Sequence, residues 1–122
     1  MSRTGNTIAI IDDDESVRHA LRRLVQSAGW KALTFASAEE FLQSPARPPP
    51  YCLILDMRLP GLSGLDLKKQ LDAEARTVPV IFITAHVDEQ VRQQALQAGA
   101  IAFLSKPFEE QALLDALALA VG

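Results

Sequence analysis

The sequence contains one cysteine, Cys52, and two histidines among its 122 residues. A single cysteine permits no internal disulfide, which fits a reducing compartment. The two histidines are far apart, and His19 falls in the middle of an expected helix, so neither indicates a zinc site. No apolar run approaches the roughly 18–20 residues that a membrane span requires, and the amino-terminal MSRTGNT has no apolar signal-peptide core. We therefore expect a cytoplasmic protein that does not engage a membrane.

The sequence also lacks an excess of positive charge. It has 12 Lys and Arg against 15 Asp and Glu, a formal net charge of −3. Nucleic-acid binding depends on clustered Lys and Arg, so we expect no direct nucleic-acid contact from this domain. Neither G-x-G-x-x-G nor G-x-x-x-x-G-K-[ST] occurs, which disfavours nucleotide binding. The acidic stretch DDDESVR lacks the alternating ligands and central glycine of an EF-hand.

Short apolar runs alternate with helical patterns along the whole chain. We expect a single domain over residues 1–122, in which SPARPPP (44–50) is a stiff surface loop. Five strands alternating with five helices predict an α/β fold with an open parallel sheet covered on both faces. The patterns do not give the order of the strands. The strands are expected over 7–11, 30–35, 51–55, 78–84 and 100–104, and the helices over 17–28, 38–43, 65–75, 88–98 and 108–120.

Several helix ends have recognisable capping residues. Ser37 with Glu40 three residues later predicts a capping box for a short helix that ends near Gln43. Gly29 and Gly99 are expected to end the first and fourth helices. Asp14 and Glu15 are typical of a helix amino terminus, where negative charge is favourable.

The polar residues with chemical potential follow the expected strands. Asp12 and Asp13 follow the first strand, Asp56 the third, Thr84 ends the fourth, and Lys106 comes shortly after the fifth. In open α/β sheets, ligands bind beyond the carboxyl ends of the strands. Two carboxylates about 4–5 Å apart repel by roughly 3–4 kcal/mol at an effective dielectric constant of about 20. A hard divalent cation relieves that repulsion. Mg²⁺ prefers a site with a small number of protein oxygens, several waters and an incoming phosphate.

A carboxylate beside such an ion can attack phosphorus and form an aspartyl phosphate. Lys106 would neutralise charge on the phosphoryl oxygens, and the Thr84 hydroxyl could donate a hydrogen bond to one of them. Taken alone, Thr84 is equally well explained as an ordinary strand residue.

Four segments, IIDDDES, LDMRLPGLSG, FITAH and FLSKPF, occur in this order, each at a strand end. Together they resemble the receiver domain of two-component response regulators. The segments DMRLPGLSG and GAIAFLSKPFEE are most similar to the FixJ-like branch. The resemblance implies a flavodoxin-like (βα)5 fold with strand order 2-1-3-4-5. It implies a signalling switch that accepts a phosphoryl group from a sensor histidine kinase and relays it to an output partner or domain, commonly for transcriptional control. Such a domain catalyses only its own phosphorylation and dephosphorylation.

The resemblance also implies roles for individual residues. Asp56 would be the phosphoacceptor, Lys106 the phosphate-pairing lysine, and Thr84 and Phe103 the switch pair. The bond before Pro107 would be a cis peptide. Mg²⁺ would be held by carboxylates and by one main-chain carbonyl, and the lifetime of the phosphate would be tuned by two flanking side chains. The implied metal ligands are Asp12, Asp13, Asp56 and the carbonyl of Arg58, and the implied tuning residues are Arg58 and His86.

Some alternatives stay open at this point. His86 could equally be an exposed loop residue. The last helix is apolar most of the way round, which favours a homodimer or output contact through the surface of helix 4, strand 5 and helix 5. The alternative is that the end of this helix is apolar and simply exposed. A haloacid-dehalogenase-type phosphatase is disfavoured, because Arg58 stands where that family has a second Asp. A binding module that has abandoned phosphorylation is the third reading. Members of this branch often carry a helix-turn-helix output domain, and the sequence does not show whether one follows Gly122.

Overall fold

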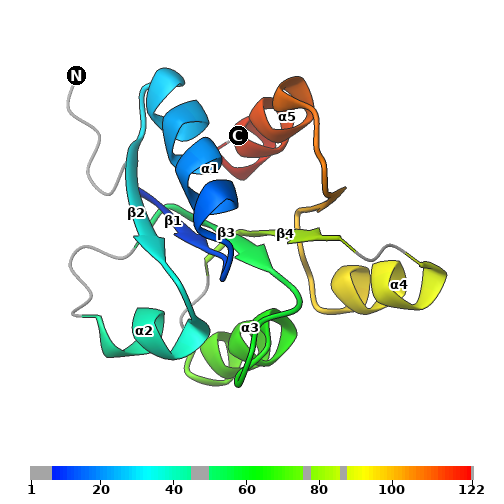
Figure 1. Cartoon of the computed structure of the whole chain (residues 1–122). Helices are drawn as coiled ribbons and strands as arrows, with labels where there is room; N and C mark the ends of the chain where they lie inside the picture. Colours follow the sequence, from blue (N-terminus) through cyan, green and yellow to red (C-terminus); the bar gives the residue numbers. More distant parts are fainter. Residues whose placement is uncertain (1–6, 45–49, 76–77, 86–87, 122) are drawn as a thin grey trace.

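The computed structural model describes residues 7–44, 50–75, 78–85 and 88–121. Strands and helices alternate strictly along the chain (Figure 1), as the sequence predicts. The strands are β1 (Thr7–Ile11), β2 (Lys31–Phe35), β3 (Cys52–Asp56), β4 (Val80–Thr84) and β5 (Ala102–Ser105). The helices are α1 (Glu15–Ser27), α2 (Ala38–Gln43), α3 (Gly64–Ala73), α4 (Glu89–Gln97) and α5 (Glu110–Val121).

The five strands form one parallel sheet in the order β2-β1-β3-β4-β5, the order that the family resemblance implied. In this register Asp56 lies opposite Ile83, and Thr84 lies opposite Ser105. The carboxyl ends of β3, β4 and β5 therefore meet at one edge of the sheet. Helices α1 and α5 cover one face, and α2, α3 and α4 cover the other (Figure 1).

Each face of the sheet has its own hydrophobic core. Strands β3 and β4 are buried along their whole length, which explains why both are almost continuously apolar. Alternate residues of each strand point to opposite faces, so neighbours in sequence belong to different cores. The core under α1 and α5 includes Ile8, Ile10, Leu21, Val25, Ile54, Ile81, Ile83, Leu113 and Leu117. The opposite core includes Ile11, Phe41, Leu53, Leu55, Leu67, Leu71, Val80, Phe82 and Ala95.

Helix α2 confirms one half of the predicted capping box and corrects the other. Ser37 Oγ accepts a hydrogen bond from the Glu40 amide at 3.0 Å, as expected for an N-cap. The Glu40 carboxylate accepts from the amide of Ala36 at 3.2 Å, one residue earlier than the capping box requires. The reciprocal bond is therefore displaced, although it still satisfies a backbone donor at the start of the helix.

The fifth strand begins two residues later than predicted. Gly99 has φ of +84° and ends α4 as expected, but the Ala100 amide still bonds to the carbonyl of Ala95 at 3.2 Å. Residue 100 therefore belongs to the helix ending, and pairing with β4 starts with the Ile101 amide bound to the Val80 carbonyl at 3.0 Å. Apolar character alone does not distinguish these two uses of the backbone.

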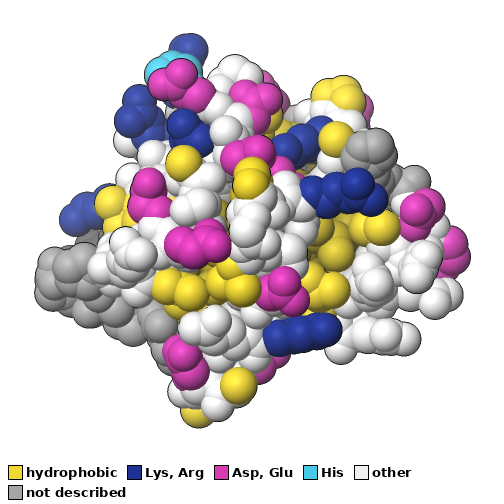
Figure 2. Space-filling view, turned by 60° about the horizontal axis from the view of Figure 1, so that its bottom comes forward, with side chains coloured by type: hydrophobic (Ala, Val, Ile, Leu, Met, Phe, Trp, Pro, Cys, Tyr) yellow, Lys and Arg dark blue, Asp and Glu magenta, His cyan; other side chains and the backbone are white. Residues whose placement is uncertain are grey.

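Helix α5 is only partly covered. Leu113 and Leu117 are buried against the sheet, whereas Leu119 is 68% exposed. Among the described residues, none of the helices is long and apolar enough to cross a membrane. On the face seen in Figure 2, acidic and basic side chains are interspersed rather than gathered into areas of one sign.

Candidate functional site: a carboxylate pocket at the ends of three strands

Three carboxylates meet at the carboxyl-terminal edge of the sheet. Asp12 and Asp13 follow β1, and Asp56 is the last residue of β3, the strand beside it. One carboxylate oxygen from each lies within 4.8 Å of the other two. Asp12 is fully buried and Asp56 is 4% exposed, whereas Asp13 is exposed. The predicted acidic residues are therefore brought together, with an open side at Asp13.

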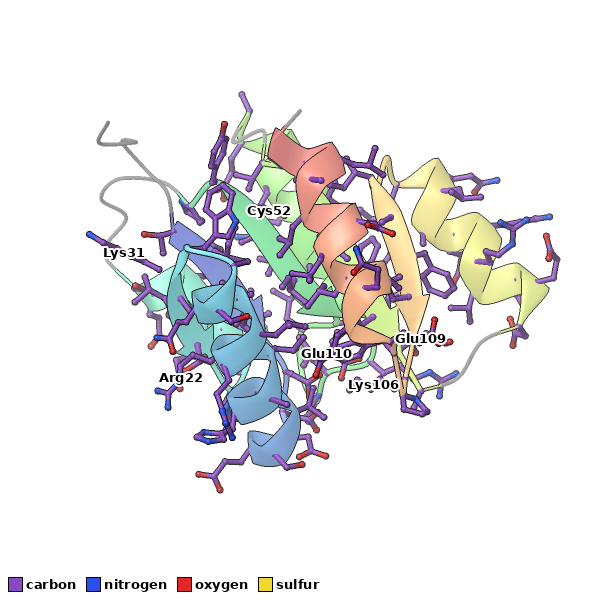
Figure 3. All side chains as sticks on the ribbon, turned by 90° about the horizontal axis from the view of Figure 1, so that it is seen from above. Arg22, Lys31, Cys52, Lys106, Glu109 and Glu110 are labelled. Atoms are coloured by element: carbon purple, nitrogen blue, oxygen red, sulfur yellow. The ribbon has the colours of Figure 1, made fainter. Side chains whose placement is uncertain are left out.

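Lys106 supplies the opposite charge in the pocket. It follows β5, and its Nζ lies 2.7 Å from Asp12 Oδ2 and 3.0 Å from Asp56 Oδ2. Figure 3 shows Lys106 at the same end of the molecule as Glu109 and Glu110, where α5 begins. Burial by itself would lower the pKa of the Lys106 ammonium, but its contacts with Asp12 and Asp56 outweigh burial and raise it. The lysine is therefore charged at neutral pH.

Asp56 is held by its own strand end. Its Oδ1 accepts a hydrogen bond from the Arg58 amide at 2.9 Å, and its Oδ2 accepts from Lys106 Nζ. Burial raises the pKa of the Asp56 carboxyl, and the charge of Asp12 adds to that effect. The bonds from Arg58 and Lys106 act in the opposite direction without reversing it. The carboxylate is thus poorly solvated and held with a defined orientation.

The β1–α1 connection is fixed by contacts that sequence reasoning did not predict. The Arg18 guanidinium of α1 donates to the carbonyl of Asp12 at 2.7 Å, and the Asp14 amide donates to Asp12 Oδ1 at 2.9 Å. Asp14 lies at the amino terminus of α1, as predicted, and it is the N-cap, since its side chain accepts from the amides of Ser16 and Val17. The hydrogen bonds from the hydroxyl and amide of Ser16 lower the pKa of Asp14. No sequence pattern relates Arg18 to Asp12, because the contact is made by a side chain that reaches back over the turn.

Gly64, at the start of α3, approaches the end of β3 very closely. Its amide donates to the carbonyl of Met57 at 3.2 Å. A Cβ at this position would lie 2.1 Å from the backbone oxygen of Asp56 and 3.0 Å from Met57 Cα. Gly64, the last residue of the PGLSG segment, therefore has to be glycine, because a side chain there would collide with the backbone of Asp56 and Met57.

The other residues singled out from the sequence have the following places. Thr84 is buried at the end of β4, and its carbonyl accepts from the Lys106 amide at 2.8 Å. Phe103 is partly buried in β5, opposite Phe82. The Arg58 side chain is exposed, and the Lys106–Pro107 peptide bond is cis, the isomer that the resemblance implied. His86 lies outside the described residues.

The donors in the pocket suit a hard divalent cation. Asp12 Oδ2 is buried and accepts no hydrogen bond with acceptable angles from any described residue; its 2.7 Å contact with Lys106 is an ion pair. Three carboxylates face one ammonium, which leaves negative charge that one lysine does not balance. An oxygen-only donor set with one exposed member matches the preference of Mg²⁺ for carboxylates together with water.

Comparison with known proteins agrees with this geometry. The model of the family described as "Response regulator receiver domain" matches residues 8–118. The chain is 45% identical over 113 residues to Nodulation protein W of Bradyrhizobium diazoefficiens, covering 93% of this chain and 50% of that protein. It is 43% identical over 121 residues to the response regulator protein TodT of Pseudomonas putida, covering 99% of this chain and 53% of that protein. The chain spans about half the length of these curated relatives.

Solved structures give the same result. The response regulator StyR has 51% identity and a TM-score of 0.84, with 93% of this chain and 58% of that chain covered. The structure titled FixJ-N has 34% identity and a TM-score of 0.85, with 98% and 94% covered. The chain therefore belongs to the response regulator receiver domain family. It is a receiver domain of a two-component response regulator, the class in which an acidic pocket at this edge of the sheet generally binds Mg²⁺.

Proposed function

We propose that Asp56 accepts a phosphoryl group from a phosphohistidine of a sensor histidine kinase. One carboxylate oxygen of Asp56 attacks phosphorus, the new P–O bond forms and the P–N bond to the imidazole breaks. The departing imidazole keeps the bonding electron pair and takes up a proton. The product is an aspartyl phosphate, which water later hydrolyses. Residues 1–122 then act as one phosphoacceptor domain whose chemistry is confined to its own phosphorylation and dephosphorylation.

The observation that carries this proposal is that Lys106 Nζ contacts the carboxylates of both Asp12 and Asp56. Asp56 Oδ1 is held by the Arg58 amide at 2.9 Å, so the other oxygen, which contacts Lys106, is presented to the pocket. Lys106 carries positive charge where the phosphoryl oxygens would lie, and charge stabilisation of that kind dominates phosphoryl transfer. The buried Thr84 at the adjacent strand end would donate its hydroxyl hydrogen to the bound phosphoryl group.

Mg²⁺ would be held by the carboxylates of Asp12, Asp13 and Asp56 and by the carbonyl of Arg58. When bound, it would offset the repulsion between the carboxylates and the incoming phosphate. Lys106 alone provides one positive charge against three negative ones. We propose the exposed Arg58 side chain, together with His86, as the groups that tune the lifetime of the aspartyl phosphate.

The signal would leave the domain through Thr84 and Phe103. Movement of Thr84 toward the phosphoryl group would let Phe103, partly buried in β5, change its packing and alter the surface of α4, β5 and α5. Leu96 of α4 and Leu119 of α5 are both exposed, which suits contact with a second copy or an output domain. TodT and StyR are named as response regulators, and other relatives as transcriptional regulatory proteins, so transcriptional control is the proposed output.

Phosphorylation of the wild-type domain by a small phosphodonor tests the proposal. Incubation with acetyl phosphate and Mg²⁺ is expected to add one phosphoryl group, detected by intact-protein mass spectrometry, and EDTA is expected to prevent it. Peptide mapping after borohydride trapping is expected to place the modification on Asp56. No added phosphate, in protein shown to be folded by circular dichroism, would favour a binding module that has abandoned phosphorylation.

Mg²⁺ is also expected to stabilise the unphosphorylated domain. At about ten times its Kd, the ion should raise the free energy of unfolding by about 1.4 kcal/mol, which corresponds to a Tm increase of roughly 3–6 °C. Differential scanning fluorimetry at constant ionic strength measures the shift. Asp13→Asn should reduce it, whereas Asp115→Asn, which alters an exposed acid of α5, should not. A shift equally large in Asp13→Asn would place the ion elsewhere.

A further inference from the structure

The connection between β3 and α3 is held from outside the pocket by a residue of α2. Glu39 Oε2 accepts a hydrogen bond from the Leu62 amide at 2.9 Å, across 23 positions of sequence. Helices α2 and α3 lie side by side on the same face of the sheet (Figure 1). The contact therefore joins a short, separate helix to the loop that follows the proposed phosphoacceptor.

The loop and helix α2 both hold the groups that make this contact in place. Gly61 has φ of +73°, and a Cβ there would lie 2.6 Å from Glu39 Oε2, so the carboxylate rests directly against the loop backbone. The hydrogen bond from Leu62 lowers the pKa of Glu39, which keeps the carboxylate ionised at neutral pH. Helix α2 is itself anchored, because Phe41 is buried and its ring meets Phe35 edge to face at 5.3 Å.

The loop over residues 58–64 is fixed near its two ends by backbone contacts with the site. At its start the Arg58 amide bonds to Asp56 Oδ1, and at its end the Gly64 amide bonds to the Met57 carbonyl. Between these points Pro60 and Gly61 are exposed. The bond from Leu62 to Glu39 is a third point of attachment, made by a charged acceptor, and hydrogen bonds of that kind are stronger than neutral ones.

We propose that Glu39 is a positioning residue for the phosphoryl-transfer site, which holds the 58–64 loop so that the backbone of Arg58 keeps its place beside Asp56. This inference rests on the proposed function, since the carbonyl of Arg58 matters only if that site binds Mg²⁺. Glu39 is not among the three carboxylates of the pocket. Its effect would be transmitted through the loop backbone from Leu62 to Arg58.

The chain offers a matched control for Glu39 in its neighbour Glu40. Both are exposed acids in the first turn of α2, and each accepts a hydrogen bond from a backbone amide outside the helix. Glu39 accepts from Leu62 in the loop, whereas Glu40 accepts from Ala36, directly before the helix. Replacing either with Ala removes one negative charge and one acceptor from the same helix end. Only Glu39→Ala releases the loop.

The experiment compares Glu39→Ala, Glu40→Ala and Glu39→Gln in the full chain. Isothermal titration calorimetry with MgCl₂ is expected to show a Kd about 3- to 10-fold higher for Glu39→Ala and little change for Glu40→Ala. Hydrogen exchange followed by NMR is expected to show faster exchange of the Leu62 amide in Glu39→Ala alone. Glu39→Gln should restore much of both properties, because its side-chain carbonyl can still accept from Leu62.

Equal effects of Glu39→Ala and Glu40→Ala on the Mg²⁺ Kd would overturn the positioning role while leaving the proposed function intact. Unchanged exchange of the Leu62 amide in Glu39→Ala would overturn the tether itself. If the wild-type chain bound no Mg²⁺, the proposed function would fail, and the positioning role would fail with it. The wild-type titration therefore separates the two failures.

Discussion

Asp56→Asn is expected to abolish phosphoryl uptake from acetyl phosphate and Mg²⁺-dependent binding of beryllofluoride. The amide of Asn is a far weaker nucleophile than a carboxylate, and it withdraws one of the three negative oxygen donors of the pocket. Intact-protein mass spectrometry measures the first loss, and a beryllofluoride titration followed by NMR or fluorescence measures the second. We expect the phosphorylated fraction to fall from near completion to the detection limit.

Asp14→Asn is the control for this substitution. Asp14 lies two residues from Asp12, but its side chain caps α1, and Asn is an equally good N-cap. Phosphorylation of Asp14→Asn should therefore proceed as in the wild type. Beryllofluoride binding by Asp56→Asn as tight as by the wild type would show that the phosphoacceptor has been assigned to the wrong residue.

Loss of folding would not explain the effect of Asp56→Asn. Because burial raises the pKa of Asp56 in the folded protein, the ionised carboxylate is favoured more in the unfolded chain. The resulting contribution to stability is fully present below the unfolded pKa and is lost as pH rises through the folded pKa. At neutral pH the Asn variant avoids that penalty, so its Tm in the absence of Mg²⁺ should equal or exceed that of the wild type.

Much of the fold could be predicted because both the apolar runs and the residues at helix ends of this sequence indicate the same elements. Continuous apolar runs such as CLIL mark strands buried on both faces, and β3 and β4 are indeed buried throughout. Asp14, Ser37 and Gly99 define helix ends by local chemistry that a single sequence displays. The strand order could not be obtained this way. It depends on which apolar faces meet across long crossovers, and it came from the family resemblance.

The pocket was predictable for a related reason. Residues that end parallel strands share one edge of the sheet, so Asp12, Asp56 and Lys106 converge wherever the strands themselves are correctly assigned. The supporting contacts were not predictable. Arg18 reaches the carbonyl of Asp12, and Glu39 reaches the amide of Leu62. In each pair a side chain meets a backbone group outside the fixed spacing of a helix cap, so no sequence pattern identifies the contact.

Gly64→Ala is expected to destabilise the protein strongly, although it leaves every charged group in place. The added methyl group would lie 2.1 Å from the carbonyl oxygen of Asp56 and 2.9 Å from its carbonyl carbon. These are backbone atoms of a fully buried strand, so they cannot move aside as the end of a flexible side chain can. Overpacking of this kind typically costs 1–3 kcal/mol, and we expect a loss of about 2–3 kcal/mol in the free energy of unfolding.

Helix propensity predicts the opposite change in stability for Gly64→Ala, so the measured sign decides between the two effects. Gly64 is the first residue of α3, and within a helix Ala is favoured over Gly by about 1 kcal/mol. Propensity alone therefore predicts a more stable variant, whereas the contact with Asp56 predicts a less stable one. Urea unfolding followed by circular dichroism distinguishes the two signs. A Gly64→Ala protein as stable as the wild type would contradict the close approach.

Gly29→Ala provides the comparison that separates the pocket from general strain. Gly29 has φ of +94°, so Ala there is strained by about 1–2 kcal/mol, but a Cβ would meet nothing within 4 Å. It ends α1 at the opposite edge of the sheet from Asp56. Both variants should lose stability, and only Gly64→Ala should also slow phosphorylation by acetyl phosphate under conditions where each is fully folded. The displacement of the Asp56 backbone would then be measured directly as a loss of phosphoryl transfer.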